Sequence, residues 1–413
     1  MTRSLRKTII KLGQSNPIFS QCPAGIVSLA TMLILSIAAF FITPNSQIPS
    51  RNTEANELAT TLGQVGIDEC ATSQNWHHCY QLFFERIGEK KDLGILIAIL
   101  QSIQRKDEKT LNCHILSHTI TKVALTEDLK NWKRYLSIID PYACNYGYVH
   151  GLIEGRSIVD KTFVINKKTI PAFCLELQEQ TKSRGIDQTC SHIMGHIMLV
   201  DKEDDIPTAI TGCNELPQWQ HRECFAGTFM EHFTRDDLVA HGIGNHIPWN
   251  DENIRLQEQI CESYTGLASI SCWQEISHMY NNRAKFDPTA VYKQCQKAPT
   301  SDAIDACYMH GVNTLATNQV ATSSYRSSLC APYEKKSASY NACTNNIIFS
   351  LIFSGVSLTK QALAYCDASL STHQATCYRT VGRALNARTT QDEKITWCKL
   401  APKNFYSSCM NER

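Results

Sequence analysis

The cysteines constrain this chain more than any other feature. Eighteen of its nineteen cysteines fall into successive pairs along the sequence. In seven pairs the second cysteine follows the first by 11 to 16 residues, and in most of these it opens an apolar, helix-like run such as CSHIMGHIML. This spacing predicts disulfides that each join the two helices of a hairpin. The seven pairs are Cys174/Cys190, Cys213/Cys224, Cys261/Cys272, Cys295/Cys307, Cys330/Cys343, Cys366/Cys377 and Cys398/Cys409.

Two earlier pairs, Cys70/Cys79 and Cys113/Cys144, are less regular, and sequence alone leaves their connectivity open. Cys22 is the expected unpaired cysteine. Zinc sites built from cysteine use C-x(2–4)-C clusters, which this sequence lacks. Because disulfides persist in oxidising compartments, the chain is predicted to fold in the periplasm, in a secretory lumen or outside the cell.

One segment is apolar enough to cross a membrane. Residues 24–43 (AGIVSLATMLILSIAAFFIT) carry no charge, and a helix of this length spans a bilayer core. Basic residues precede it, which predicts a cytoplasmic N-terminus and an uncleaved signal-anchor. A cleaved signal peptide is the alternative, although the apolar run is long for one and no A-x-A site follows it. The basic residues are Arg3, Arg6, Lys7 and Lys11.

These features predict the domain organisation. The anchor separates a cytoplasmic tail from a polar linker and a disulfide-rich helical domain on the other side of the membrane. The first part of that domain is rich in histidine and glutamate, and the second part contains the most regular cysteine pairs. The predicted ranges are 1–23 for the tail, 24–43 for the anchor, 44–65 for the linker and 66–413 for the domain, divided into 66–285 and 286–413.

The later helix-opening cysteines recur with a nearly constant period. Cysteines 272, 307, 343, 377 and 409 are separated by 35, 36, 34 and 32 residues, a spacing typical of two-helix solenoid units. Asp287, Ser301 and Thr390 are positioned as helix N-caps. The predicted fold is therefore all-α, with αα-hairpin repeats in a solenoid or curved α/α array, stapled by disulfides and preceded by one transmembrane helix.

Two stretches of the second half, QCQKAPTSDAIDACYMHGVNTLA and YCDASLSTHQATCYRTVGRAL, resemble the cysteine-stapled branch of the tetratricopeptide/Sel1-like repeat families. The resemblance covers residues of about 255 to 413 best. It implies a scaffold or binding surface and assigns no catalytic residue.

The first half carries metal-type ligands one helical turn apart. Residues at i and i+4 lie on the same face of a helix, so each such pair can approach one ion. Three segments, CHILSH, HGLIE and HIMGH, have this spacing, and CFAGTFMEHF and CWQEISHMY add further histidines and glutamates. The residues are His114/His118, His150/Glu154, His192/His196, Glu231, His232, Glu275 and His278.

The angular position of these residues around their helices reduces the number of candidate ligands. Counted at about 100° per residue from each helix-opening cysteine, seven of them and His310 share an arc of roughly 140°. His114, His118 and His232 fall outside this arc. The residues inside it are His150, Glu154, His192, His196, Glu231, Glu275, His278 and His310.

This constellation predicts a site for a divalent transition metal, with zinc, iron or manganese as candidates. The alternative for any single histidine is a satisfied residue of the core. The first functional hypothesis is a membrane-anchored extracytoplasmic enzyme, either a metal-dependent hydrolase or an oxidoreductase. The second is a non-catalytic scaffold that binds a protein or glycan on its concave face. The predicted ligands are His118, His150, Glu154, His192, His196 and Glu231.

The overall charge gives no reason to expect a nucleic-acid partner. The chain has 40 basic and 39 acidic residues and a net charge of +1. A nearly neutral balance does not attract a polyanion over the whole surface.

Overall fold

A computed structural model describes residues 51–411, except for 74, 90, 112, 145, 161, 164–168, 182–185, 236–237, 240–242 and 318–321. The regular structure of these residues is entirely helical, with no strand among them, which confirms the predicted all-α class. Two compact units are present, residues 1–57 and 58–413, and the second is described below.

The predicted anchor, residues 24–43, lies outside the described residues, and so does Cys22. Among the described residues, no helix combines the length and apolar character that a membrane crossing requires. The predicted linker is partly helical, because the first described helix begins at Arg51.

The first half of the chain contains the helices from Arg51 to Arg283. The α-helices are α3 Arg51–Cys70, α4 Trp76–Gly88, α5 Leu93–Gln104, α6 His114–Glu127, α7 Trp132–Ile138, α8 Gly147–Val159, α9 Thr169–Thr181, α10 Ile186–Asp201, α11 Ile206–Cys213, α12 His221–Thr234, α14 Asp251–Glu262, α15 Gly266–Glu275 and α16 Ser277–Arg283. Short 3₁₀ helices are η2 Glu108–Leu111, η3 Leu129–Asn131 and η4 Gln218–Gln220.

The second half continues with shorter connections. Its α-helices are α17 Pro288–Cys295, α18 Ser301–Thr317, α19 Ser323–Ser328, α20 Ser337–Ser354, α21 Thr359–Ala368, α22 Gln374–Arg388, α23 Gln391–Cys398 and α24 Tyr406–Met410. Its 3₁₀ helices are η5 Ala331–Tyr333 and η6 Val356–Leu358.

Local capping explains where several of these helices begin. The Asp287 side chain accepts a hydrogen bond from the backbone N–H of Thr289 at the start of α17, as predicted. Thr390 forms a capping box with Glu393 at the start of α23. The prediction for α18 is wrong by one residue, because Thr300 accepts the capping bond and Ser301 is already helical.

All nine predicted disulfides are present. Most of them join one helix to the next helix in the sequence, as Cys366 in α21 and Cys377 in α22 do. The exception is Cys113–Cys144, whose cysteines precede α6 and α8 and so tie together the N-terminal ends of two helices that pack side by side. This bridge does not close a simple hairpin.

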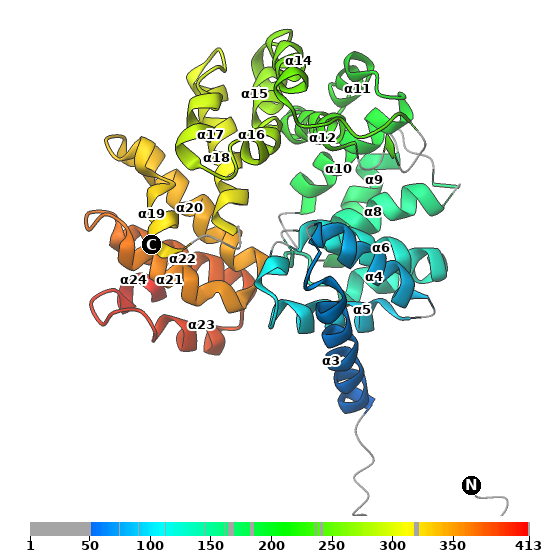
Figure 1. Ribbon diagram of the computed structural model, residues 1–413, viewed down its shortest axis with the longest axis horizontal. Coiled ribbons are helices and arrows are strands. Elements are labelled where there is room, and N and C mark those ends of the chain that lie inside the picture. The colour runs from blue at the N-terminus through cyan, green and yellow to red at the C-terminus, as the bar shows by residue number, and fades with distance from the viewer. Residues whose placement is uncertain are drawn as a thin grey trace, which may run out of the picture. The chain divides into compact units, whose positions relative to one another are not determined.

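Within residues 58–413, one series of helices packs each member against the next, in the order α4, α6, α8, α10, α12, α15, α18, α20, α22 and α24. The ribbon turns round as it passes along this series, so that the late helices return beside the early ones (Figure 1). Arg388 at the end of α22 donates a hydrogen bond of 2.9 Å to Asp140, and the ring of Phe353 lies 5.4 Å from that of Tyr142. These contacts close the series into a ring.

Candidate metal centre

Four consecutive helices of this series, α6, α8, α10 and α12, carry the predicted ligands. Glycines allow two pairs of these helices to approach closely. A Cβ atom at Gly151 would lie 2.3 Å from the Cα of His118, and one at Gly227 would lie 1.7 Å from the carbonyl oxygen of His192. Both distances are far below van der Waals contact, so only glycine permits this packing. The close approach brings side chains of neighbouring helices together.

Glu154 on α8 lies at the centre of the resulting cluster and contacts histidines from three helices. Its Oε2 is 3.0 Å from Nδ1 of His118, and its Oε1 is 2.5 Å from Nε2 of His150 and 3.5 Å from Nδ1 of His196. The Nε2 atom of His150 is buried, and its approach to Glu154 lacks the direction of a hydrogen bond, so among the described residues this nitrogen has no hydrogen-bond partner.

Two pairs of imidazoles face each other through their Nε2 atoms. The distance is 3.2 Å between His114 and His118 and also 3.2 Å between His192 and His196. His150 lies between the two pairs and belongs to two groups of three histidines. Within each group, one nitrogen of every residue lies within 4.8 Å of the others. The groups are His114/His118/His150 and His150/His192/His196.

The opposite ring nitrogens of three of these histidines are held by acceptors. Nδ1 of His114 lies 3.1 Å from the carbonyl oxygen of Cys144, and Nδ1 of His196 lies 3.1 Å from Oε2 of Glu231. The other oxygen of Glu231 accepts the backbone N–H of Leu238 at 2.7 Å. With the contact between His118 and Glu154, these bonds fix ring orientation and leave Nε2 facing the neighbouring imidazole.

Burial sets the protonation of the cluster. Burial lowers the pKa of His114 and of His192 to about 3, and it lowers the pKa of His150 well below its ordinary value. These imidazoles are therefore neutral at physiological pH. For His196, burial acts in the same direction, but the hydrogen bond to Glu231 and the charge of Glu154 raise its pKa overall.

Glu154 is ionised. Its burial alone would raise the pKa of the carboxyl group, but the adjacent imidazoles of His150 and His118 outweigh this effect and hold the pKa well below its usual value. Neutral imidazoles and an ionised carboxylate are the protonation states that bind metals.

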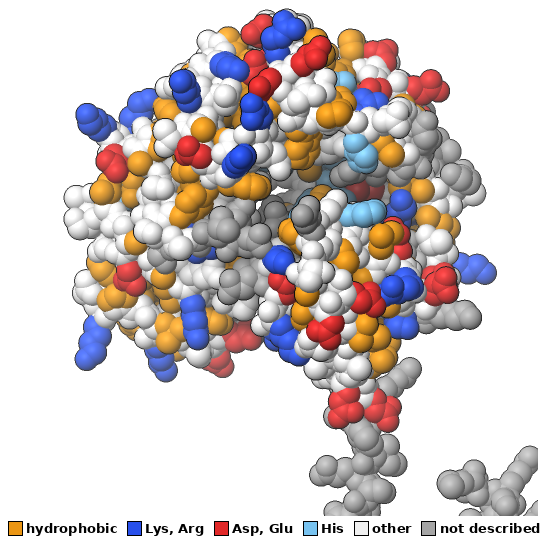
Figure 2. Space-filling model, in the orientation of Figure 1, with side chains coloured by type: hydrophobic (Ala, Val, Ile, Leu, Met, Phe, Trp, Pro, Cys, Tyr) orange, Lys and Arg blue, Asp and Glu red, His pale blue; other side chains and the backbone are white. Residues whose placement is uncertain are grey.

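The cluster is not wholly sealed from solvent. The side chains of His150, Glu154 and His196 are 3%, 7% and 4% exposed, whereas that of His118 is 20% exposed. Figure 2 shows a hollow near the middle of one face, with histidine side chains exposed at its edge.

The structure brings all six predicted residues into this one cluster. It adds His114, which the phase argument had left out although its i/i+4 spacing to His118 was visible. It also adds Met230, whose sulfur lies 3.3 Å from Nε2 of His192. Met230 lies six residues after Cys224, the same phase as His150 and His196, but only histidine and glutamate were counted as ligands. We call these residues the first cluster. Its members are His114, His118, His150, Glu154, His192, His196, Met230 and Glu231.

His232 belongs elsewhere, as its phase predicted. Its Nδ1 lies 2.8 Å from Asp204, and its Nε2 lies 3.0 Å from the side-chain oxygen of Gln257. Both ring nitrogens are thus engaged by protein groups, which is the satisfied core histidine of the alternative interpretation.

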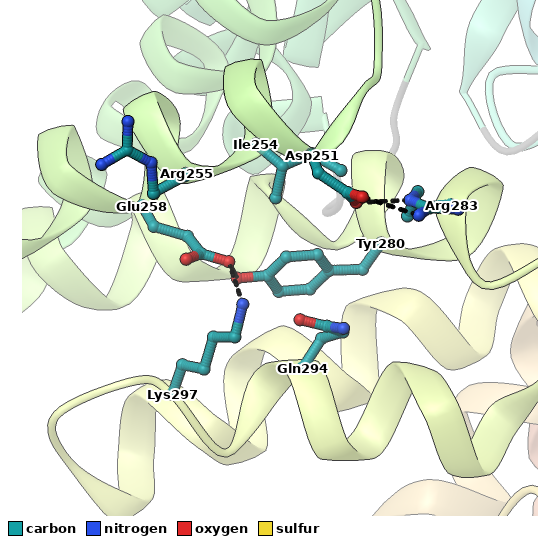
Figure 3. Close-up of a pocket in the computed structure, with 8 residues that line it drawn as sticks. All are labelled: Asp251, Ile254, Arg255, Glu258, Tyr280, Arg283, Gln294 and Lys297. Atoms are coloured by element: carbon teal, nitrogen blue, oxygen red, sulfur yellow. Dashed lines mark hydrogen bonds and ion pairs between the residues drawn. The ribbon is translucent and has the colours of Figure 1, made fainter.

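A cavity of about 250 Å³ lies among residues of α14, α16 and α17, apart from the first cluster (Figure 3). Its charged groups are largely paired with one another. Arg283 binds Asp251, while Glu258 accepts hydrogen bonds from Lys297 at 2.7 Å and from the Tyr280 hydroxyl at 2.9 Å. Because these groups already satisfy each other, we do not assign the cavity a chemical role.

Compared with known protein families, curated proteins and solved structures, the chain shows no significant match.

Proposed function

We propose that this protein binds a divalent transition metal in the first cluster and acts in an oxidising compartment outside the cytoplasm. The observation that carries the proposal is the pair of facing nitrogens of His114 and His118, 3.2 Å apart. The positions of the ring protons decide what can lie between these nitrogens.

The carbonyl oxygen of Cys144 can only accept a hydrogen bond, so Nδ1 of His114 carries the proton. Nδ1 of His118 lies 3.0 Å from Oε2 of the carboxylate of Glu154, and this contact favours a proton on Nδ1 because an ionised carboxylate cannot donate one. In neutral rings both Nε2 atoms then carry lone pairs that face each other. A cation must lie between them, either an added proton or a metal ion.

The distances suit a metal. Two nitrogen ligands at 2.0–2.1 Å from a tetrahedral zinc ion are about 3.3 Å apart. Both facing pairs show 3.2 Å. The buried Nε2 of His150 adds a nitrogen that no hydrogen bond satisfies among the described residues. Five imidazoles are thus available as ligands, and His150 is within reach of either pair.

In this proposal the two carboxylates have different roles. Both oxygens of Glu231 are engaged, one by His196 and one by the backbone of Leu238, so Glu231 orients His196. Glu154 orients His118 and also lies against His150 and His196, so it can either orient or bind directly.

The chemistry that such an ion supplies is Lewis-acid polarisation or activation of water. Together with the partial exposure of His118, this favours an enzyme, either a hydrolase or an oxidoreductase, over a purely structural ion. Imidazole and carboxylate ligands suit zinc, iron or manganese. The thioether of Met230 beside His192 is the one soft group that would favour copper(I).

Nine disulfides support the proposed compartment, since cytosolic reductants would open them. We propose that residues 24–43 anchor the chain in a membrane with residues 66–413 on the far side. We also interpret the stapled helix pairs as repeats of one αα unit.

Metal analysis of the full-length, oxidised chain tests the proposal. We expect a transition metal bound in stoichiometric amount, and its loss in His196→Gln and His150→Gln variants that keep their disulfides and helical circular dichroism. A control variant, His232→Gln, should retain the metal because His232 is satisfied by Asp204 and Gln257. A folded wild-type chain that takes up no zinc, iron, manganese or copper would reject the proposal.

Rejection would leave the scaffold hypothesis as the better account. In that case the first cluster is a buried network held by shared protons, and a protein or glycan partner binds the surface of the ring. The metal analysis therefore separates the two hypotheses directly.

A further inference from the structure

A second group of histidine and glutamate lies farther along the same series of helices. Glu275 is the last residue of α15, His278 is in the first turn of α16, and His310 is on α18. One ligand atom from each of the three comes within 4.8 Å of the others. We call these three residues the second cluster. It shares no residue with the first cluster.

The break between α15 and α16 at Ile276 positions two of these side chains. Oε2 of Glu275 lies 3.5 Å from Nε2 of His278, without the direction of a hydrogen bond. Both atoms are buried, and among the described residues neither has a hydrogen-bond partner. A buried polar atom without a partner costs about 1–3 kcal/mol, and more if the group is charged. A cation bound by both atoms would remove this cost.

The other atoms of the cluster are fixed by neighbours. Oε1 of Glu275 accepts a hydrogen bond of 2.8 Å from Gln274, which leaves Oε2 available. Nδ1 of His310 lies 3.1 Å from the hydroxyl of Ser277, and its Nε2 lies 3.8 Å from Oε1 of Glu275. A hydroxyl on one ring nitrogen orients the other nitrogen toward a ligand, as in the outer shell of metal sites.

We propose that Glu275, His278 and His310 form a second, separate site for a divalent transition metal, with a two-histidine, one-carboxylate ligand set and open coordination positions. The carboxylate is fully buried, whereas the side chains of His278 and His310 are 23% and 22% exposed. The two imidazoles thus reach the surface in part, whereas Oε2 of Glu275 and Nε2 of His278 are buried. Three protein ligands with an open side are typical of catalytic metal sites.

This inference deepens the proposed function and rests on it, because it adds a second metal site on the same series of helices. The two sites are neighbours. The buried charge of Glu275 acts electrostatically on His192 of the first cluster.

Zinc binding to the full-length, oxidised chain tests the second site. The metal-free protein is dialysed against Zn²⁺, and bound zinc per chain is measured by mass spectrometry. We expect Glu275→Gln and His310→Asn each to bind one zinc ion fewer than the wild type. We expect Ser277→Ala to keep the ligands but to weaken the affinity of this site about 10- to 100-fold. His373→Asn, in the second half, is the matched control and should bind as the wild type does.

The outcomes separate this inference from the proposed function. If Glu275→Gln, His310→Asn and Ser277→Ala all keep the wild-type zinc content and affinity while His196→Gln loses zinc, the second site is rejected and the first stands. If only the variants of the second cluster lose zinc, the second site stands and the first is rejected. If no variant changes zinc binding, both are rejected. Glu275→Gln preserves side-chain shape and Ser277→Ala removes only a hydroxyl, so these variants test binding even where His310→Asn fails to fold.

Discussion

The two halves of the ring are built from the same kind of disulfide-linked helix pairs, but they carry different side chains at equivalent positions of their helices. In both, a disulfide joins an outer helix to the helix that packs into the series. The residue six positions after the helix-opening cysteine is histidine at 150, 196 and 278 and methionine at 230, but asparagine at 313, phenylalanine at 349 and arginine at 383. Neighbouring helices of the second half meet through neutral contacts, such as Ser350 with Asn313 at 3.0 Å.

This difference shows what the scaffold itself requires. In the second half, neutral contacts such as Ser350 with Asn313 and Thr380 with Asn345 join neighbouring helices, so histidine and glutamate are not needed for this packing. Burying a carboxylate costs several kcal/mol unless its partners compensate. The buried charges of the first half are therefore better explained by a ligand than by folding.

The close approach of α10 and α12 at Gly227 should give the largest effect of a single substitution. Gly382 in the second half makes a similar approach, since a Cβ there would lie 1.8 Å from the carbonyl oxygen of Cys409. Gly227→Ala would place a Cβ 1.7 Å from the backbone of His192, so α10 and α12 must move apart. We expect a loss of about 3 kcal/mol in the free energy of unfolding, the upper end for overpacking. In Gly311→Ala on α18 the nearest atom is a side-chain oxygen at 3.3 Å, and we expect a change within about 1 kcal/mol. Urea unfolding of the oxidised variants measures both, and equal losses would contradict the comparison.

The disulfides should stabilise both halves alike. Cys261–Cys272 and Cys366–Cys377 each close a separation of 11 residues. Replacing both cysteines of either pair by serine should cost about 3 kcal/mol, because each bridge restricts the unfolded chain similarly. The measurement is again urea unfolding under oxidising conditions. A much smaller loss of unfolding free energy for the Cys261–Cys272 pair would show that interactions other than the disulfides stabilise the first half.

Metal bound at the first cluster should stabilise the first half. Zinc at about 100 times its dissociation constant should add about 2.7 kcal/mol for each occupied site. His150→Gln should remove the contribution of the first site, whereas Asn313→Ala, at the equivalent position of α18, should keep it. Thermal unfolding followed by circular dichroism, with and without a chelator, measures the difference. Equal responses of the two variants would argue against a site at His150.

In the metal-free protein, acidification should lower the stability of the first half. Burial lowers the pKa of His192 to about 3, against about 6.5 in the unfolded chain, so the unfolded state binds the proton more readily. The stability is complete above pH 6.5 and is lost as the pH falls toward 3. Between pH 7 and pH 5 this residue should account for a loss of about 2 kcal/mol. His192→Gln should reduce the pH dependence by that amount, and an unchanged slope would refute the assignment.

The sequence by itself determined the features that depend on local geometry. Cysteines on adjacent helices of a hairpin are near each other whatever the rest of the chain does, so their regular spacing predicted seven bridges. It left the connectivity of Cys70, Cys79, Cys113 and Cys144 open. Histidines at i and i+4 share a helix face for the same reason. The phase count from the helix-opening cysteines also brought His150, Glu154 and His196 together correctly, because their helices pack in succession with equivalent orientation.

Only the tertiary structure decided the rest. His118 fell outside the predicted arc because Cys113 pairs with Cys144 across the ends of α6 and α8, so an angle counted from Cys113 does not transfer to the other helices. Met230 has the same phase after Cys224 as His196 has after Cys190, but only the contact of α12 with α10 shows that its sulfur reaches His192. The closure of the ring through Arg388 and Asp140 joins residues 248 positions apart. Such contacts depend on how much each helix is rotated relative to the one before it, added over the whole series. No local sequence pattern determines that total.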